Sequence, residues 1–389
     1  MNIVIIQPNW QAVSEVWIQR MQEYIERDIK GVAAFLPLYE DIEAPFELFN
    51  LNGRNPTVKE RFLIKLKLLK YDRKGIIVKE LLAFIKEKKV DIVLIHFLSA
   101  AEYISDIFRH IQIPVLVHVH GIDILWDAKD FYNSHNNYYP AQYKINCQQL
   151  FQLSNFHFLA NSIFSKQQLI EAGANPEKIV LKYFGVPMVD INRNFYKQFL
   201  TVLFLGRFVE FKGPELVVEA FFKACDNGFK GDLVMAGDGP LKPFCEMMVS
   251  RSKYKNKVRF LGKVNKEEAS QLFQQADIYT MHSCRGALTN EVEAFGVSII
   301  EAMSYHLPVI TGALGGPVEI ITNGVDGILV TPGDTDGHAA ALMEIFHNKE
   351  YAKLLGNNAA KTIVDKFSPE KEKNILLSTI NSLVCNKEY

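Results

Sequence analysis

The chain has 389 residues, of which 48% are hydrophobic and 22% charged, and its formal net charge at pH 7 is −1. This length suits two domains of moderate size, and the composition excludes an intrinsically disordered chain. The net charge near zero gives no overall field that attracts nucleic acid, so no nucleic-acid partner is expected. The five cysteines are scattered, without a metal-binding or redox spacing, which is typical of reduced thiols in the cytosol.

The first residues predict a strand and not a signal peptide, because they lack a basic segment and a long apolar run. No stretch approaches the roughly 20 apolar residues that a membrane helix needs. We therefore expect a cytoplasmic protein, and peripheral attachment to the inner face of the cell membrane stays open.

Short β-branched segments alternate with longer helical patterns, an order that is typical of parallel sheets with crossover helices. Four nearly all-apolar segments of the first half read as buried strands: Ile3–Ile6, Ile92–His96, Val115–Val119 and Phe156–Ala160. A second series follows: Val202–Leu205, Asp232–Ala236, Val258–Leu261, Ile278–Met281, Pro308–Thr311 and Gly327–Val330. Helical patterns between these strands include Glu215–Cys225 and Lys266–Gln275.

A polar, turn-rich stretch that starts at Tyr183 separates the two series and predicts a linker. We therefore predict an α/β protein with two doubly wound, Rossmann-like parallel-sheet domains that face a central cleft. Ligands of such sheets bind outside the carboxyl ends of the strands. The expected divisions are a first Rossmann-like domain, a linker, a second Rossmann-like domain and a C-terminal helix whose crossing back to the first domain is left open: 1–186, 187–199, 200–368 and 369–389.

Residues 59–89 hold eleven Lys or Arg and four acidic residues, with apolar residues between them. A basic amphipathic helix of this kind can lie on an anionic membrane surface. The alternative is a helix pair with its apolar side in the core and its lysines in solvent. The sequence leaves both interpretations open.

The strongest local signal is the segment from Glu293 to Met303. Gly296 suits a turn, and the residues after it suit a helix whose first N–H groups lack partners within the helix. Such a helix start is a natural binding site for a phosphate group. Glu293 and Glu301 place acceptors for sugar or ribose hydroxyls on either side of it. As a bare spacing the two glutamates would be typical of solvated surface residues, so the flanking motifs decide.

These flanks carry a resemblance. The segment His282–Glu319 resembles the donor-site signature of family-4 retaining glycosyltransferases, in which seven residues separate two glutamates. Other stretches agree in chain order: Gly206–Arg207 with Lys212–Gly213, Ala236–Pro240, Phe260–Val264, His118–Asp123 and Asn161–Lys166. The likeness runs along nearly the whole chain and is specific only when the motifs are taken together. It implies the GT-B fold, a nucleotide diphosphate-sugar as substrate, no cofactor and no metal.

The resemblance implies a donor site in the second half. Arg207 and Lys212 would neutralise the diphosphate, which gains negative charge as the glycosidic bond breaks. Glu301 would accept hydrogen bonds from the ribose, and Glu293 would lie near the hydroxyls of the transferred sugar. The remaining donor-side candidates act through the turns and N–H groups around the nucleotide: Gly239, Lys263, Val264, Gly296 and Val297.

In the first half, His120 follows a predicted strand and should point into the cleft. The resemblance implies that it contacts the donor sugar near the reacting carbon, and the alternative is a histidine bonded to backbone at a strand end. His118 alternates to the same face and is expected to be buried support. Asp123 would either orient this turn or hold an acceptor hydroxyl. Lys166 would approach the phosphates or be a solvated lysine.

The first βα turn departs from the commoner family pattern of two adjacent glycines. Here Gln7–Trp17 has no glycine and resembles the Ser-Glu turn of a subgroup that acts in exopolysaccharide or surface-polysaccharide assembly. Ser14 and Glu15 are therefore acceptor-side candidates. Trp17 is a third candidate, and it would stack on an acceptor sugar or pack in the domain.

Together these features predict a retaining hexosyltransferase that moves a sugar from a UDP-sugar or GDP-sugar to a growing, lipid-linked bacterial glycan. No protein nucleophile is needed, since the departing phosphate can take the acceptor proton. The alternatives are a nucleotide-sugar 2-epimerase of the GT-B fold and a non-catalytic nucleotide-sugar-binding scaffold. The chain lacks Gly-x-Gly-x-x-Gly after its first strand, which argues against a dinucleotide dehydrogenase.

Overall fold

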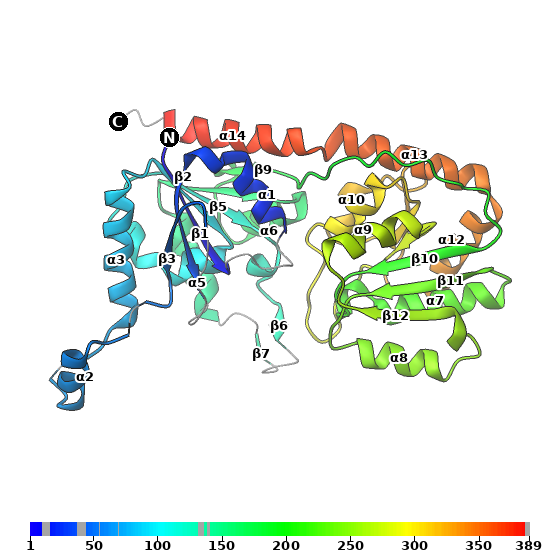
Figure 1. Cartoon of the computed structure of the whole chain (residues 1–389), viewed down its shortest axis with the longest axis horizontal. Coiled ribbons are helices and arrows are strands. Elements are labelled where there is room, and N and C mark those ends of the chain that lie inside the picture. Colours follow the sequence, from blue (N-terminus) through cyan, green and yellow to red (C-terminus); the bar gives the residue numbers. More distant parts are fainter. Residues whose placement is uncertain are drawn as a thin grey trace.

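The computed structural model describes residues 1–9, 16–36, 44–53, 55–68, 70–130, 136–137 and 141–385. Two α/β domains lie side by side, and each is built around its own parallel sheet (Figure 1). The predicted tandem of two parallel-sheet domains is therefore confirmed.

The first sheet has seven strands in the order β3-β2-β1-β4-β5-β8-β9, and all its neighbouring pairs are parallel. Its strands are β1 (Ile3–Asn9), β2 (Ile29–Phe35), β3 (Glu47–Asn50), β4 (Ile92–His96), β5 (Val115–Val119), β8 (Phe156–Ala160) and β9 (Ile179–Leu181). A small antiparallel pair, β6 (Lys129–Asp130) with β7 (Asn136–Asn137), lies apart from it. The sequence prediction missed β2, β3 and β9, because β2 includes Lys30 and Gly31 and the other two are short strands at the sheet edges.

Helices cover both faces of this sheet, and alternate residues of β1 show how. Val4 and Ile6 belong to one apolar cluster with Ile77 of α3, whereas Ile3 and Ile5 belong to another with Met21 of α1. The helices of the first domain are α1 (Val16–Ile25), α2 (Val58–Lys65), α3 (Arg73–Glu87), α4 (Leu98–Tyr103), α5 (Ala141–Phe151) and α6 (Ile163–Glu171).

The second sheet has six parallel strands in the order β12-β11-β10-β13-β14-β15. They are β10 (Leu200–Leu205), β11 (Gly231–Ala236), β12 (Val258–Gly262), β13 (Ile278–Thr280), β14 (Val309–Gly312) and β15 (Ile328–Val330), all close to the predicted positions. The helices of this domain are α7 (Pro214–Asp226), α8 (Lys242–Ser250), α9 (Lys266–Gln275), α10 (Val297–Ser304), α11 (Pro317–Ile320), α12 (Thr335–His347) and α13 (Lys349–Lys366). Its interior is one large apolar cluster.

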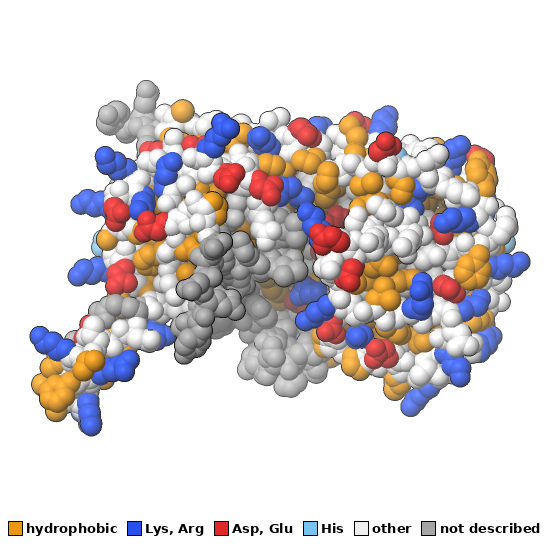
Figure 2. Space-filling view, viewed as in Figure 1, with side chains coloured by type: hydrophobic (Ala, Val, Ile, Leu, Met, Phe, Trp, Pro, Cys, Tyr) orange, Lys and Arg blue, Asp and Glu red, His pale blue; other side chains and the backbone are white. Residues whose placement is uncertain are grey.

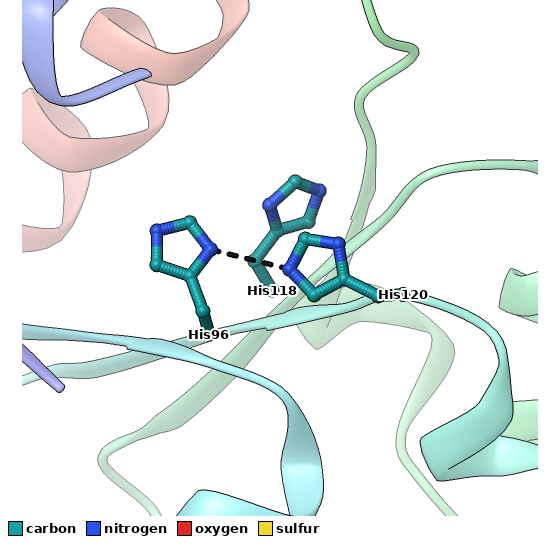
Figure 3. Close-up of side chains that lie close together, drawn as sticks. All are labelled: His96, His118 and His120. Atoms are coloured by element: carbon teal, nitrogen blue, oxygen red, sulfur yellow. Dashed lines mark hydrogen bonds between the residues drawn. The ribbon is translucent and has the colours of Figure 1, made fainter. Parts of the chain in front are cut away.

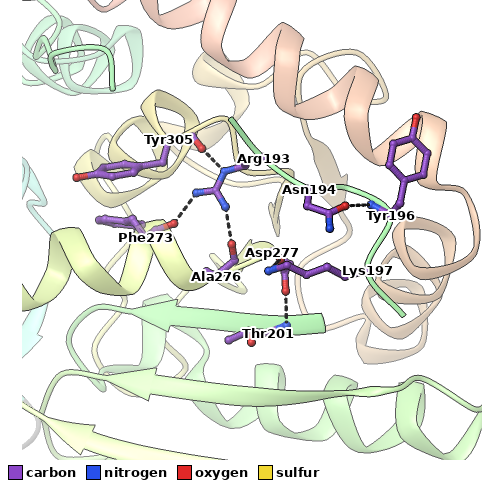
Figure 4. A network of polar contacts seen from close by, with 9 residues as sticks. All are labelled: Arg193, Asn194, Tyr196, Lys197, Thr201, Phe273, Ala276, Asp277 and Tyr305. Atoms are coloured by element: carbon purple, nitrogen blue, oxygen red, sulfur yellow. Dashed lines mark hydrogen bonds and ion pairs between the residues drawn. The ribbon is translucent and has the colours of Figure 1, made fainter. Parts of the chain in front are cut away.

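The stretch between β9 and β10 is fastened to the second domain by Arg193 (Figure 4). Burial lowers the pKa of this guanidinium to about 10. It donates hydrogen bonds to three backbone carbonyls, those of Phe273, Ala276 and Tyr305. Nearby, Lys197 pairs with Asp277 at 2.7 Å. The second half of the linker is therefore part of the second domain in structural terms.

The last helix, α14 (Pro369–Cys385), runs back over the first domain (Figure 1). Leu376 and Ile380 pack in the same cluster as Ile3 and Ile5. Glu372 of this helix lies 2.6 Å from the ammonium of Lys182, and both side chains are fully buried. In the described ranges, no helix is both long and apolar enough to cross a bilayer.

Candidate functional site

A left-handed glycine starts helix α10 at the edge of the second sheet. Gly296 has φ of 110° and occupies the N-cap position, where no side chain caps the helix. A Cβ added there would lie 2.9 Å from Ile299 Cδ1 and would need a backbone conformation that L side chains rarely adopt. The predicted turn and helix start are therefore present, and the first N–H groups of such a helix suit an anion.

A partly buried ion pair lies at the same edge. Lys212 Nζ is 2.6 Å from Glu293 Oε2, and the two side chains are only 12% and 13% exposed. Arg207 and Lys212 approach the ring of Phe211 together, at 5.5 and 5.6 Å from its centroid. Two of the predicted phosphate-binding cations and the predicted sugar-binding glutamate thus converge after β10 and β13.

Glycine also permits close packing of the turns after β10 and β11. A Cβ on Gly237, which has φ of 129°, would lie 1.9 Å from the carbonyl oxygen of Gly206. Gly239, with φ of 153°, packs against Phe208, whose carbonyl oxygen would be 2.6 Å from an added Cβ. After β12, the side chain of Lys263 is exposed and Val264 is half-buried.

Glu301 projects from α10 and is half-buried. Burial raises the pKa of its carboxyl group to about 7, and the charges of Arg20 and Lys266 oppose this rise. Arg20 belongs to α1 of the first domain and Lys266 to the second, so charges of both domains influence the pKa of Glu301. Near neutral pH this carboxyl group exists in both protonation states.

Three histidines gather at the carboxyl ends of β4 and β5 (Figure 3). His96 and His118 are register partners on the two strands, and His120 follows two residues after His118. His96 Nδ1 lies 3.2 Å from His120 Nε2, and the His118 and His120 ring centroids are 4.3 Å apart. His96 was absent from the residues predicted from sequence, and only the parallel pairing of β4 with β5 reveals it.

All three imidazoles are neutral at physiological pH. Burial lowers the pKa of His96 to about 3 and holds those of His118 and His120 well below the ordinary value. The positive charge of Lys182 acts in the same direction on each ring. Neutral imidazoles act as hydrogen-bonding groups and metal ligands, not as cations.

The rings also have the composition of a metal site. Ligand atoms of the three histidines all lie within 4.8 Å of one another. Both nitrogens of His118, Nε2 of His96 and Nδ1 of His120 have no hydrogen-bond partner among the described residues. This donor set suits zinc. However, the same Lys182 charge that lowers the three pKa values also opposes a bound cation.

Asp123 holds the turn that carries His120. It is fully buried, and its carboxylate accepts the N–H groups of His120 at 3.0 Å and Leu98 at 2.7 Å. Burial raises its pKa to about 6, although the backbone hydrogen bonds oppose this effect. Of the two roles that the sequence left open, these contacts favour orientation of the turn.

The two domains meet where this turn touches the glutamate segment. Gly121 has φ of 110°, and a Cβ on it would lie 2.4 Å from Ala294 Cβ. Ala294 directly follows Glu293, so the His120 turn and the donor-side glutamate are neighbours across the domain interface. A side chain larger than hydrogen at Gly121 would force the two segments apart.

Further contacts cross the interface at α6. The carboxylate of Glu319 accepts the N–H groups of Ile163 at 2.7 Å and Phe164 at 3.2 Å, and the hydroxyl of Tyr183 at 2.9 Å. Lys166 lies within the first turn of α6 and is half-buried. A pocket between the domains is lined from one side by Trp126 and from the other by residues that include Arg285.

The acceptor-side candidates of the first turn are only partly visible. Ser14 and Glu15 lie outside the described residues. Trp17 is half-buried, with its ring centroid 5.6 Å from that of Phe184 and 6.1 Å from that of His120. Trp17 therefore packs inside the domain, beside the histidine cluster.

Comparison with known families finds a match in the second half of the chain. Residues 190–362 match the family described as glycosyl transferases group 1. The match begins in the linker and ends within α13, so this family resembles the second domain over nearly its whole length.

Curated relatives agree with this. An uncharacterized glycosyltransferase of Methanocaldococcus jannaschii is 29% identical over 57% of this chain and 54% of its own. An amylovoran biosynthesis glycosyltransferase of Erwinia amylovora is 26% identical over 66% of this chain and 61% of its own. The chain spans about half the length of the curated relatives it matches.

Solved structures confirm the predicted GT-B fold over the whole chain. Sucrose-phosphate synthase of Thermosynechococcus elongatus has a TM-score of 0.76 at 16% identity, with 99% of each chain covered. Anabaena HepE in complex with UDP has a TM-score of 0.73 at 16% identity, covering 98% of this chain and all of that one. The same Anabaena protein has also been solved in complex with UDP-glucose.

Proposed function

We propose that this protein is a retaining glycosyltransferase that moves a hexose from a nucleotide diphosphate-sugar to a hydroxyl group of a growing bacterial polysaccharide. The observation that carries the proposal is the close approach of Gly121 and Ala294. It sets the His120 turn of one domain against Glu293 and the α10 helix start of the other. Fold neighbours solved with UDP and UDP-glucose support a UDP-sugar as the donor class.

In this proposal the diphosphate lies over the start of α10. The N–H groups that follow Gly296 and the helix dipole favour negative charge there. Arg207 and Lys212 neutralise the charge that the diphosphate gains during bond cleavage. Glu301 accepts hydrogen bonds from the ribose, and Glu293, next to Lys212, accepts them from hydroxyls of the sugar.

The reaction balances without a nucleophile from the protein. The acceptor oxygen forms a bond to the anomeric carbon on the side from which the diphosphate leaves, and the bond from that carbon to the phosphate oxygen breaks. The acceptor proton passes to the departing phosphate. Anomeric configuration is retained because the acceptor attacks the face from which the diphosphate leaves. Neutral His120 serves as a hydrogen-bonding group near the reacting carbon. We propose that no metal ion or cofactor takes part, because Arg207 and Lys212 supply the positive charge.

The acceptor is proposed to be a lipid-linked glycan at the inner face of the cell membrane. A relative named for amylovoran biosynthesis supports a polysaccharide product. The Ser-Glu turn of the sequence points in the same direction. In this setting the enzyme would work in the cytoplasm and bind the membrane peripherally.

A thermal-shift screen tests the donor part of the proposal. UDP-glucose, UDP-galactose, UDP-N-acetylglucosamine and GDP-mannose are compared, and a donor is expected to raise the melting temperature because ligand binding stabilises the folded state. Product NMR with the donor and a soluble glycan acceptor then reports an α-linked sugar from an α-linked donor. If none of these donors is bound, the proposal fails. An isomerised sugar formed without an acceptor would instead support the 2-epimerase alternative.

A further inference from the structure

Helix α2 projects from the first domain with apolar side chains in solvent (Figure 1). None of its residues is buried. Val58 is 85% exposed, Phe62 62% and Leu68 72%, and Leu66 is exposed as well. Figure 2 shows apolar side chains gathered on this projection with Lys and Arg around them. We call residues 57–68 the α2 finger.

The finger has its own start signal. Thr57 accepts the N–H of Glu60 at 3.3 Å, and Glu60 accepts the N–H of Thr57 at 2.7 Å, which completes a capping box. This cap satisfies two backbone donors locally and requires no contact with the domain. A helix of eight residues is nevertheless marginal in water without a surface to pack on. The finger therefore has the local order of a helix, and the described part of the chain supplies no apolar partner of the kind that normally stabilises one.

The charge on the finger indicates what that partner is. The finger contains one acid, Glu60, and four cations: Lys59, Arg61, Lys65 and Lys67. Glu60 is engaged in the cap, whereas the four cations are exposed. A surface that combines exposed aromatic and aliphatic groups with a ring of cations complements an anionic lipid surface.

Helix α3 provides the contrast within the same basic stretch. Its apolar residues Ile77, Leu81 and Phe84 are buried in the core of the first domain. Two cations of this region are paired with acids, Lys74 with Asp106 at 3.6 Å and Lys88 with Glu47 at 2.5 Å. The solvated-lysine interpretation therefore fits α3, and the membrane interpretation is narrowed to α2.

We propose that the α2 finger docks on an anionic phospholipid surface, with Phe62, Leu66 and Leu68 inserted among the lipids and the cations at the headgroups. The finger lies on the side of the first domain away from α14 (Figure 1). Docking thus attaches the protein to the membrane by the side of the first domain that is opposite α14. The inference rests on the proposed function only for the identity of the lipid-linked acceptor, because lipid binding needs neither donor nor acceptor.

The test is co-sedimentation of the full chain with two kinds of vesicle at low salt. One is pure phosphatidylcholine, and the other contains 30% phosphatidylglycerol, a composition chosen for the assay. Binding to the anionic vesicles alone is expected. The pair Lys59→Gln with Lys65→Gln should lower the partition coefficient roughly 30-fold, since each surface cation contributes on the order of 1 kcal/mol. Phe62→Ser with Leu66→Ser should lower it at least about 10-fold through lost apolar burial.

The matched control is Lys79→Gln with Lys86→Gln, which removes the same charge from exposed positions of α3. This pair should weaken binding far less than the α2 pair. In a second measurement, adding anionic vesicles should shift the tryptophan emission of the Phe62→Trp variant to shorter wavelength. The shift should exceed any shift of the unsubstituted chain, which has three tryptophans of its own. Absence of vesicle binding, equal loss in the α2 and α3 pairs, or no spectral shift would each overturn the proposal. If the partner is an acidic protein and not a lipid, the finger should not bind vesicles. Vesicle binding does not depend on sugar transfer, so failure of the proposed function would leave the vesicle result unchanged.

Discussion

Where the two domains face each other, the second domain presents charged side chains, whereas the first domain presents neutral imidazole rings. Lys212 and Glu293 form a paired set at 2.6 Å, with Arg207 beside the same aromatic ring. Opposite them, burial keeps the imidazoles of His96, His118 and His120 uncharged. This difference assigns charge compensation of a departing diphosphate to one domain. It assigns positioning of the sugar by short hydrogen bonds to the other.

The largest effect is expected on the charged side. Lys212→Ala should lower kcat by roughly 10²- to 10³-fold, as removal of one group that stabilises transition-state charge does elsewhere. Steady-state kinetics with a saturating donor measures this effect. Lys361→Ala, at an exposed position on α13 of the same domain, is the control and should leave kcat unchanged.

The same variant separates charge from packing. Lys212→Ala leaves Glu293 partly buried and without this ion-pair partner, which lowers stability. Combining it with Glu293→Gln should restore much of the melting temperature and none of the turnover. Recovery of turnover in the double variant would show that Lys212 serves only to neutralise Glu293.

A smaller effect is expected on the neutral side. His120→Ala should lower kcat about 10- to 100-fold, and His96→Ala about 10-fold, because His96 acts through its 3.2 Å contact with His120. In the His120→Ala background the His96 change should then cost little, since residues in direct contact are non-additive. His110→Ala, an exposed histidine of the same domain, is the control. Fully additive losses would mean that His96 does not act through His120.

The KM for the donor is expected to change several-fold with pH. Because burial raises the pKa of Glu301 to about 7, its carboxylate form, which binds ribose hydroxyls, grows as the pH rises through neutrality. The KM for the donor should therefore fall between pH 6 and pH 8, and Glu301→Gln should flatten this dependence. A profile unchanged by Glu301→Gln would remove Glu301 from donor binding.

The same shift has a consequence for stability. The folded-state pKa lies above the ordinary value of 4.5, so the folded protein holds this proton more tightly than the unfolded chain does. The contribution of Glu301 to stability is therefore present at low pH and is lost as the pH rises from about 4.5 through about 7. Melting curves of wild type and Glu301→Gln should diverge across this interval.

The smallest effect is expected from chelation. Since the Lys182 charge opposes a cation at the histidine cluster, incubation with EDTA followed by desalting should leave kcat unchanged. The contrary result is a loss of activity on EDTA treatment that added zinc reverses. If zinc does not restore activity in the His96→Ala variant, the cluster holds a catalytically required metal.

The sequence predicted the turn and helix around Gly296 but not the histidine cluster of the first domain, and the reason is physical. Gly296, Glu293 and Glu301 lie within one short segment, so local turn and helix chemistry is enough to place them. By contrast, His96 becomes a neighbour of His120 only through the pairing of β4 with β5.

Contacts between distant segments were equally hidden from sequence. Glu319 caps a helix of the other domain, and Glu372 meets Lys182 across 190 residues of chain. Neither contact has a local signature, because each depends on how the two domains are placed. The short edge strand β3 was missed since its half-exposed residues lack the apolar pattern of a buried strand.

The return of α14 to the first domain affects the order in which the molecule can be completed on the ribosome. Ile3, Ile5 and Leu94 share a cluster with Leu376 and Ile380, so one face of the first sheet waits for a helix made more than 270 residues after β4. Domains usually fold as they are synthesised, N-terminal first. Here the first domain to be synthesised is the last to be completed. Until α14 is made, α1 covers only part of this apolar face, and the ammonium of Lys182 lacks its partner Glu372.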